Sequence, residues 1–204
     1  MVELVHRTRD LGGGGPYLYL GLALPLAQSR ALLAGLVRLW IAQGFGVGRI
    51  PIAPGTVGSL VGMVWFGLLL MTRSPWWFTA GIIAGIALSV WLCDVAEKAL
   101  GQKDPSSVVL DEITAMPVCF FAWVAILVCQ AGSLPAFGYF FCAQTWPLTL
   151  GTFVACRLFD IAKPWPVRQS QELPGGWGIT VDDVLAAAYV NLIVLLVYAA
   201  KRLL

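Results

Sequence analysis

The chain has 204 residues, of which 59% are hydrophobic and only 12% are charged, and its mean hydropathy is +0.81. Soluble proteins carry about a quarter of charged residues, so this composition argues against a soluble globular protein and predicts one embedded in a lipid bilayer. The net charge of +2, without a basic stripe, argues against nucleic-acid binding.

The first 43 residues are expected to be an N-terminal extension of a single domain that covers residues 44–204. Residues 17–27 are apolar but too few to cross a bilayer, which needs about 20. Residues 30–45 have apolar side chains at helical spacing, interrupted by Arg30 and Arg38. This pattern predicts an amphipathic helix at the membrane interface.

Five long apolar runs follow, and each predicts a helix of roughly membrane-spanning length. They cover residues 57–71, 76–92, 113–130, 136–156 and 184–200. Short connections that contain proline join the first run to the second and the third to the fourth, which predicts helical hairpins. The predicted fold class is therefore all-α: a polytopic membrane bundle of about five long helices in hairpins, preceded by the amphipathic helix.

The hairpins determine which segments share a membrane face. A hairpin returns the chain to the side that it left, so residues 49–56, 94–112 and 157–183 should emerge together. Nine of the eleven acidic residues lie in the last two of these segments. We call the face that carries these three segments the motif face. Because these segments also hold more Lys and Arg than the opposite connections, the positive-inside rule places the motif face in the cytoplasm.

The cysteines lie inside or at the ends of apolar runs, and no CxxC pair occurs among them. This placement predicts buried thiols rather than a disulfide framework or a zinc site. The five residues are Cys93, Cys119, Cys129, Cys142 and Cys156.

A loop rich in proline and glycine, RIPIAPGTVGS at residues 49–59, leads into the first run. Free N–H groups and the positive end of the helix dipole would meet there, which favours anion binding. Gly55, Thr56 and Ser59 are therefore candidate phosphate-binding residues. The alternative is a tight entry into a membrane helix with Thr56 as its N-cap.

Acidic residues begin or end three of the runs on the motif face. Asp111 and Glu112 directly precede the third run, where two adjacent carboxylates are costly unless a cation neutralises them. Oxygen ligands without histidine or thiolate favour Mg²⁺, which completes its shell with water and substrate phosphate. The predicted metal ligands are Asp111, Glu112, Asp160, Asp182 and Asp183.

Simpler interpretations exist for some of these acids. Asp94 and Lys98 stand at i and i+4 and can pair on a helix surface. Thr180 and Asp183 fit a capping box at the start of the last run, which leaves only Asp182 unexplained.

Two cations flank Asp160 at the end of the fourth run. Arg157 and Lys163 are candidates for contacts with phosphoryl oxygens. The alternative for Lys163, with Trp165 beside it, is anchoring at the membrane interface.

Four strings, in this order, resemble the phosphatidylglycerophosphatase A family: GFGVGRIPIAPGTVGSL from residue 44, DPSSVVLDEI from 104, RLFDIAKPWPVR from 157 and GGWGITVDD from 175. The resemblance implies a magnesium-dependent hydrolase that converts phosphatidylglycerophosphate to phosphatidylglycerol in phospholipid biosynthesis, at the bacterial inner membrane. It places the family's functional residues at Asp111, Glu112, Asp160, Asp182 and Asp183, with Arg157 and Lys163 as basic partners.

We therefore expect Asp111, Glu112 and Asp160 to act in catalysis with the two cations, while the metal activates water and neutralises the phosphate. The sequence leaves open whether water or a carboxylate attacks the phosphorus. The alternative function is a small cation transporter or channel, since intramembrane carboxylates also mark ion pathways. A transporter would need acids near mid-membrane, whereas these lie at the ends of the runs.

Overall fold

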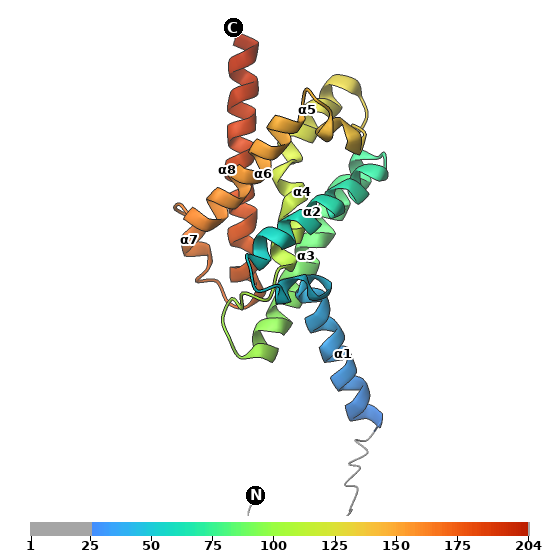
Figure 1. The fold of residues 1–204 in the computed structure, drawn as a ribbon, viewed down its shortest axis with the longest axis vertical. Coiled ribbons are helices and arrows are strands. Elements are labelled where there is room, and N and C mark those ends of the chain that lie inside the picture. The colour runs from blue at the N-terminus through green and yellow to red at the C-terminus, as the bar shows by residue number, and fades with distance from the viewer. Residues whose placement is uncertain (1–25, 204) are drawn as a thin grey trace, which may run out of the picture.

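The computed structural model describes residues 26–203, and this part of the chain is helical without strands (Figure 1). Four of its segments are long and apolar enough to cross a membrane: Pro54–Met71, Pro75–Leu100, Leu110–Ala131 and Gly176–Arg202. The predicted all-α class is confirmed. The elements are α1 (Leu26–Ala42), η1 (Gly44–Arg49), α2 (Pro54–Met71), α3 (Pro75–Leu100), α4 (Leu110–Cys119), α5 (Phe121–Ala131), η2 (Phe137–Phe141), α6 (Trp146–Ala162), α7 (Val167–Ser170) and α8 (Gly176–Leu203).

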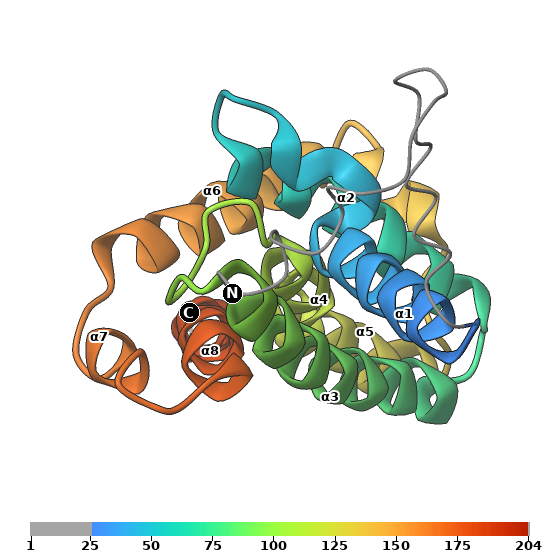
Figure 2. The ribbon, with the colours of Figure 1, turned by 90° about the horizontal axis from the view of Figure 1, so that it is seen from below.

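Helix α4 lies at the centre of the bundle. It packs against α2, α3, α6 and α8, and the view from below shows it enclosed by these helices (Figure 2). Every residue from Leu110 to Pro117 is buried except Glu112, which is partly buried. The carboxylates in the first turn of α4 are therefore held inside the protein rather than on its surface.

Two of the five predicted long helices are interrupted, each near a proline. The run at 113–130 forms α4 and α5, which part at Phe120, just after Pro117 removes a helical hydrogen bond. The run at 136–156 forms η2 and then α6, with Pro147 in the first turn of α6, where proline is tolerated. Helix α6 has only 17 residues, so the expected count of five long helices is not confirmed.

Other helices extend further toward the motif face than their apolar runs predict. Helix α2 begins at Pro54, α3 continues to Leu100 and α8 begins at Gly176. Helix α3 stops at Gly101, whose φ of 63° is the left-handed conformation that glycine adopts at little cost. Asp94, Glu97, Asp182 and Asp183, which all lie outside the apolar runs, are consequently on helices, where the helical period determines the direction of each side chain.

Helix α1 is the expected N-terminal helix, but it ends at Ala42 rather than at residue 45, because Gly44 turns the chain with a φ of +58°. It packs on α3, where the guanidinium of Arg38 lies 5.5 Å from the centre of the Trp91 ring. Its position at a membrane interface stays a prediction. Most of the apolar segment at 17–27 lies outside the described residues.

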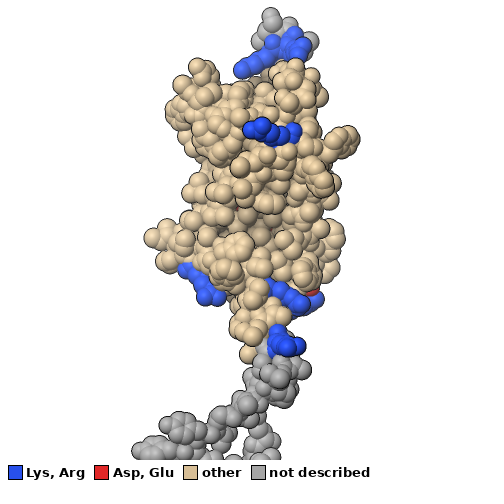
Figure 3. All heavy atoms as spheres, turned by 90° about the vertical axis from the view of Figure 1, so that its right-hand side faces the viewer, with Lys and Arg blue, Asp and Glu red and all other residues tan. Residues whose placement is uncertain are grey.

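The motif segments share one end of the bundle, as the hairpins predict. Figure 1 shows η1 and the α3–α4 and α7–α8 connections together, opposite the C-terminal end of α8. On the face drawn in Figure 3, Lys and Arg lie toward the two ends, and the surface between them carries no charge. This distribution is the one expected for a bundle with a hydrocarbon-facing belt.

A labelling experiment tests this arrangement. Cysteines introduced by Gln102→Cys and Glu172→Cys, both at exposed positions on the motif face, should react with a membrane-impermeant maleimide from the same side of sealed vesicles. Ser133→Cys, in the α5–α6 connection, should react only from the other side. A Cys129→Ser background removes the exposed native thiol. Labelling of the first two positions from opposite sides would contradict the topology.

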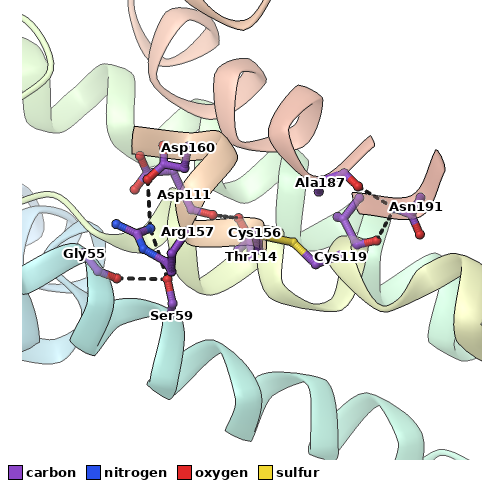
Figure 4. The surroundings of a disulfide bond; sticks show 11 residues. Gly55, Ser59, Asp111, Thr114, Cys119, Cys156, Arg157, Asp160, Ala187 and Asn191 are labelled. Carbon is purple, nitrogen blue, oxygen red and sulfur yellow. Dashed lines mark hydrogen bonds and ion pairs between the residues drawn. A yellow bond between two sulfur atoms is a disulfide. The ribbon is translucent and has the colours of Figure 1, made fainter. Parts of the chain in front are cut away.

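The structure joins Cys119 of α4 to Cys156 of α6 by a disulfide (Figure 4). The prediction of thiols is therefore wrong for this pair, and Cys129 is exposed rather than buried, whereas Cys93 is buried as expected. The paired residues are 37 positions apart. Only the packing of α6 on α4 brings them together.

Candidate active site

A polar cavity of about 420 Å³ lies at the motif end, where α2, α4, α6 and α8 meet. Its lining holds six carboxyl groups and only two cations, an excess of negative charge that is costly to enclose without a further cation. The charged residues are Asp104, Asp111, Glu112, Asp160, Asp182, Asp183, Arg157 and Lys163. The structure thus brings all five predicted acidic ligands and both predicted cations to one cavity.

Three of the carboxylates form a compact trio: Asp111, Glu112 and Asp183. One oxygen from each lies within 4.8 Å of the others, and Asp111 and Asp183 are only 7% and 4% exposed. Within the described residues, Asp111 Oδ1, Glu112 Oε2 and Asp183 Oδ2 are buried without a hydrogen-bond partner. Buried oxygens without a partner are unfavourable, so this donor set fits a hard divalent cation such as Mg²⁺.

Asp183 reaches the trio because α8 starts seven residues before it. The helix begins at Gly176, so Asp183 faces inward from the third turn instead of capping the first. Thr180, the other half of the expected capping box, shares a 2.9 Å hydrogen bond with Ser89 of α3. The capping-box interpretation is therefore wrong, and Asp183 is free to act in the site.

Asp182 points to a different partner. Its Oδ2 accepts hydrogen bonds from Lys163 Nζ at 2.6 Å and from Gln171 Nε2 at 3.1 Å. Burial lowers the pKa of Lys163, but the hydrogen bond and the charge of Asp182, with Asp160 and Asp104, outweigh burial and raise that pKa above its usual value. Lys163 therefore stays protonated at neutral pH, held at the cavity wall by Asp182.

Arg157 is positioned by contacts from two helices. Its Nη1 lies 2.9 Å from Asp160 Oδ2 and donates a 3.2 Å hydrogen bond to Ser59 Oγ, which in turn donates to the Gly55 carbonyl (Figure 4). Ser59 is fully buried and lies behind Arg157 rather than on the cavity wall. Arg157 Nε is buried with no partner among the described residues, which leaves a donor for a bound anion.

The first turn of α2 supplies further donors. The helix starts at Pro54 after Ala53, which adopts a left-handed conformation, and no side chain caps it. The interpretation of Thr56 as an N-cap is therefore wrong, since Thr56 lies inside the helix. Gly55 and Thr56 line the cavity, and N–H groups in a first helical turn have no intrahelical partner, which suits them to bind phosphate.

Gly55→Ala is expected to lower activity about 10²-fold without unfolding the protein. The added Cβ would lie 2.3 Å from Glu112 Oε1 and 2.9 Å from Arg157 Nη2, so both side chains must move. A shift of about 1 Å in a catalytic group can reduce a rate by this factor. Gly35→Ala is the control, because a Cβ there meets nothing within 4 Å. Equal rates for the two variants would contradict the proposed close approach.

Sequence reasoning missed Asp104, which lines this cavity, and Gln171, which lies outside its lining but contacts Asp182. Gln171 Nε2 donates to Asp182 and, at 3.4 Å, to Asp104 Oδ2, and thereby links the α3–α4 connection to α8. Asp104 begins the string DPSSVVLDEI, one of the four that carry the family resemblance, but nothing in the sequence pointed to Gln171. The expected pair of Asp94 and Lys98 is confirmed at 2.6 Å, and neither residue lines the cavity.

Residues 40–198 match the model of the family Phosphatidylglycerophosphatase A. A protein of that name from Escherichia coli is 34% identical, in a match that covers 79% of this chain and 83% of the relative. Another, from Haemophilus influenzae, is 36% identical, in a match that covers 76% of this chain and 84% of the relative.

A third relative, from Bacteroides thetaiotaomicron, is named "Putative phosphatidylinositol-3-phosphatase" and is 32% identical over 73% of the chain and 86% of the relative. No solved structure matches the chain. None of the three names is that of a transporter, so the comparisons do not support the alternative function.

Proposed function

Because this chain belongs to the phosphatidylglycerophosphatase A family, we propose that it hydrolyses the terminal phosphate monoester of phosphatidylglycerophosphate and releases phosphatidylglycerol for phospholipid biosynthesis. The observation that carries this proposal is the buried carboxylate trio beside an arginine with a free donor. A metal-assisted phosphatase requires carboxylates to hold the metal ion and cationic donors to bind the phosphate.

We propose that Asp111, Glu112 and Asp183 hold Mg²⁺, and that Asp160 borders this group. When bound, the ion would supply Lewis-acid stabilisation of phosphoryl charge and a lowered pKa for water. The buried oxygens without partners support this assignment. They leave open whether water or a carboxylate attacks the phosphorus.

The side chains around the trio would bind and orient the phosphate. Arg157 contributes its free Nε donor, while Asp160 and Ser59 hold its guanidinium in place. Lys163, which also lines the cavity, adds a second positive charge. With the N–H groups of Gly55 and Thr56, these donors face the charge that develops on the phosphoryl oxygens.

The position of the cavity suits a lipid substrate. It opens at one end of the apolar bundle, so a head group can enter it while the acyl chains stay in the bilayer. By the positive-inside rule, we propose that this end faces the cytoplasm and that the protein resides in the bacterial inner membrane.

Phosphate release by the purified full-length protein tests the function. Phosphatidylglycerophosphate should be hydrolysed with Mg²⁺ present, and the Glu112→Gln variant should hydrolyse it about 10³-fold more slowly. Phosphatidylinositol 3-phosphate is the comparison substrate, chosen because of the name of one relative. Release from the inositol lipid alone would assign the protein a different substrate, and release from neither lipid would contradict the proposal.

A further inference from the structure

A second cavity, of about 390 Å³, forms a groove between α5, α6 and α8. It shares no lining residue with the polar cavity. Its walls are mainly apolar, with Trp123 from α5, Leu148 and Ala155 from α6, and Val190 and Val197 from α8. The proposed phosphatase reaction uses none of these residues.

The length of this groove matches one leaflet of a bilayer. Along α8 its lining runs from Val190 to Lys201, which corresponds to about 16 Å at the rise of an α-helix. Half of the hydrocarbon core of a bilayer is about 15 Å. The groove is therefore long enough to run from mid-membrane to the surface opposite the polar cavity, at the end of α8 that stands at the top of Figure 1.

The charge at the groove mouth favours an anion. Lys201 lines the mouth and forms no ion pair within the described residues. Nearby, the Tyr198 hydroxyl accepts hydrogen bonds from Gln130 Nε2 at 3.2 Å and from Arg202 Nε at 3.0 Å. Residues 113–159 and 184–204 contain no Asp or Glu, so no acidic side chain from these segments can neutralise Lys201.

We propose that the groove binds one anionic phospholipid from the leaflet opposite the catalytic cavity. An acyl chain lies between α5, α6 and α8, and the lipid phosphate contacts Lys201. An apolar groove as long as one leaflet is thick, with an unpaired cation at its surface end, is complementary to such a lipid. A zwitterionic lipid would fill the same groove, but its head group would be attracted less strongly to the lysine.

Native mass spectrometry of the full chain with phosphatidylglycerol and phosphatidylcholine of equal chain length tests the proposal. The wild-type protein should retain phosphatidylglycerol about five-fold better. Lys201→Gln should remove that preference, whereas Arg73→Gln, a cation outside the groove, should keep it. Equal retention of both lipids by the wild-type protein would overturn the proposed head-group contact.

Filling the groove tests the acyl-chain site. Gly151 lines the groove, and a Cβ added there meets nothing within 4 Å, so Gly151→Phe should bind one lipid fewer while still releasing phosphate. Gly138→Phe, equally open but outside the groove, is the control, and Ala155→Leu is a milder second variant. Unchanged lipid counts in both groove variants, or a species of twice the chain mass that Gly151→Phe abolishes, would overturn the proposal.

Discussion

Asp183→Asn is expected to lower the rate of phosphate release about 10³-fold, whereas Asp182→Asn should lower it only about 10-fold. The two residues are adjacent, but their side chains differ in role. Asp183 belongs to the trio whose oxygens lie within 4.8 Å of one another. Asp182 is bonded to Lys163 at 2.6 Å and acts by positioning that cation.

Matched variants complete this test. Asp111→Asn and Glu112→Gln should behave like Asp183→Asn, while Glu172→Gln should retain the wild-type rate because Glu172 does not line the polar cavity. Circular dichroism and size exclusion in detergent should show that every variant is folded. Without metal, Asp183→Asn should melt no lower than the wild type, since the amide removes a charge from a crowded buried group. Equal losses for Asp182→Asn and Asp183→Asn would contradict the division of roles.

Removal of divalent metal is expected to abolish activity, and added Mg²⁺ should restore it. The trio and its neighbours offer only oxygen ligands, which suit a hard cation. Binding to the folded state should also raise the melting temperature, because a ligand at 100 times its Kd stabilises a protein by about 2.7 kcal/mol. Phosphate release measured after EDTA treatment and after Mg²⁺ titration provides the first test.

The melting temperature provides a second readout that is independent of catalysis. Mg²⁺ should raise it in the wild-type protein and in Glu172→Gln, but not in Asp183→Asn. Full turnover by metal-free enzyme would rule out the metal-assisted mechanism. A Mg²⁺-dependent stabilisation that persists in all three trio variants would place the ion elsewhere.

The sequence by itself determined which residues could meet. Charge is expensive within a bilayer, so acidic residues beside long apolar runs must lie at the ends of those runs. The hairpin connections then assign the ends to one face. Asp111, Glu112, Asp160, Asp182 and Asp183 all line one cavity, as this reasoning predicts. The apolar composition likewise predicted the helical membrane bundle.

Only the tertiary structure decided which acidic residue joins the carboxylate trio and which one contacts Lys163. Hydropathy places the start of the last run at residue 184, but α8 begins at Gly176 because Gly175 and Gly176 pack directly against α3, with no room for a Cβ beside Asp94 or the Val90 carbonyl. That start directs Asp183 into the site and Asp182 toward Lys163. The break after Pro117 and the pairing of Cys119 with Cys156 also depend on how α4, α5 and α6 pack. Apolar runs specify that a segment is buried in lipid or protein, whereas the rotation of each helix depends on the neighbours that it contacts.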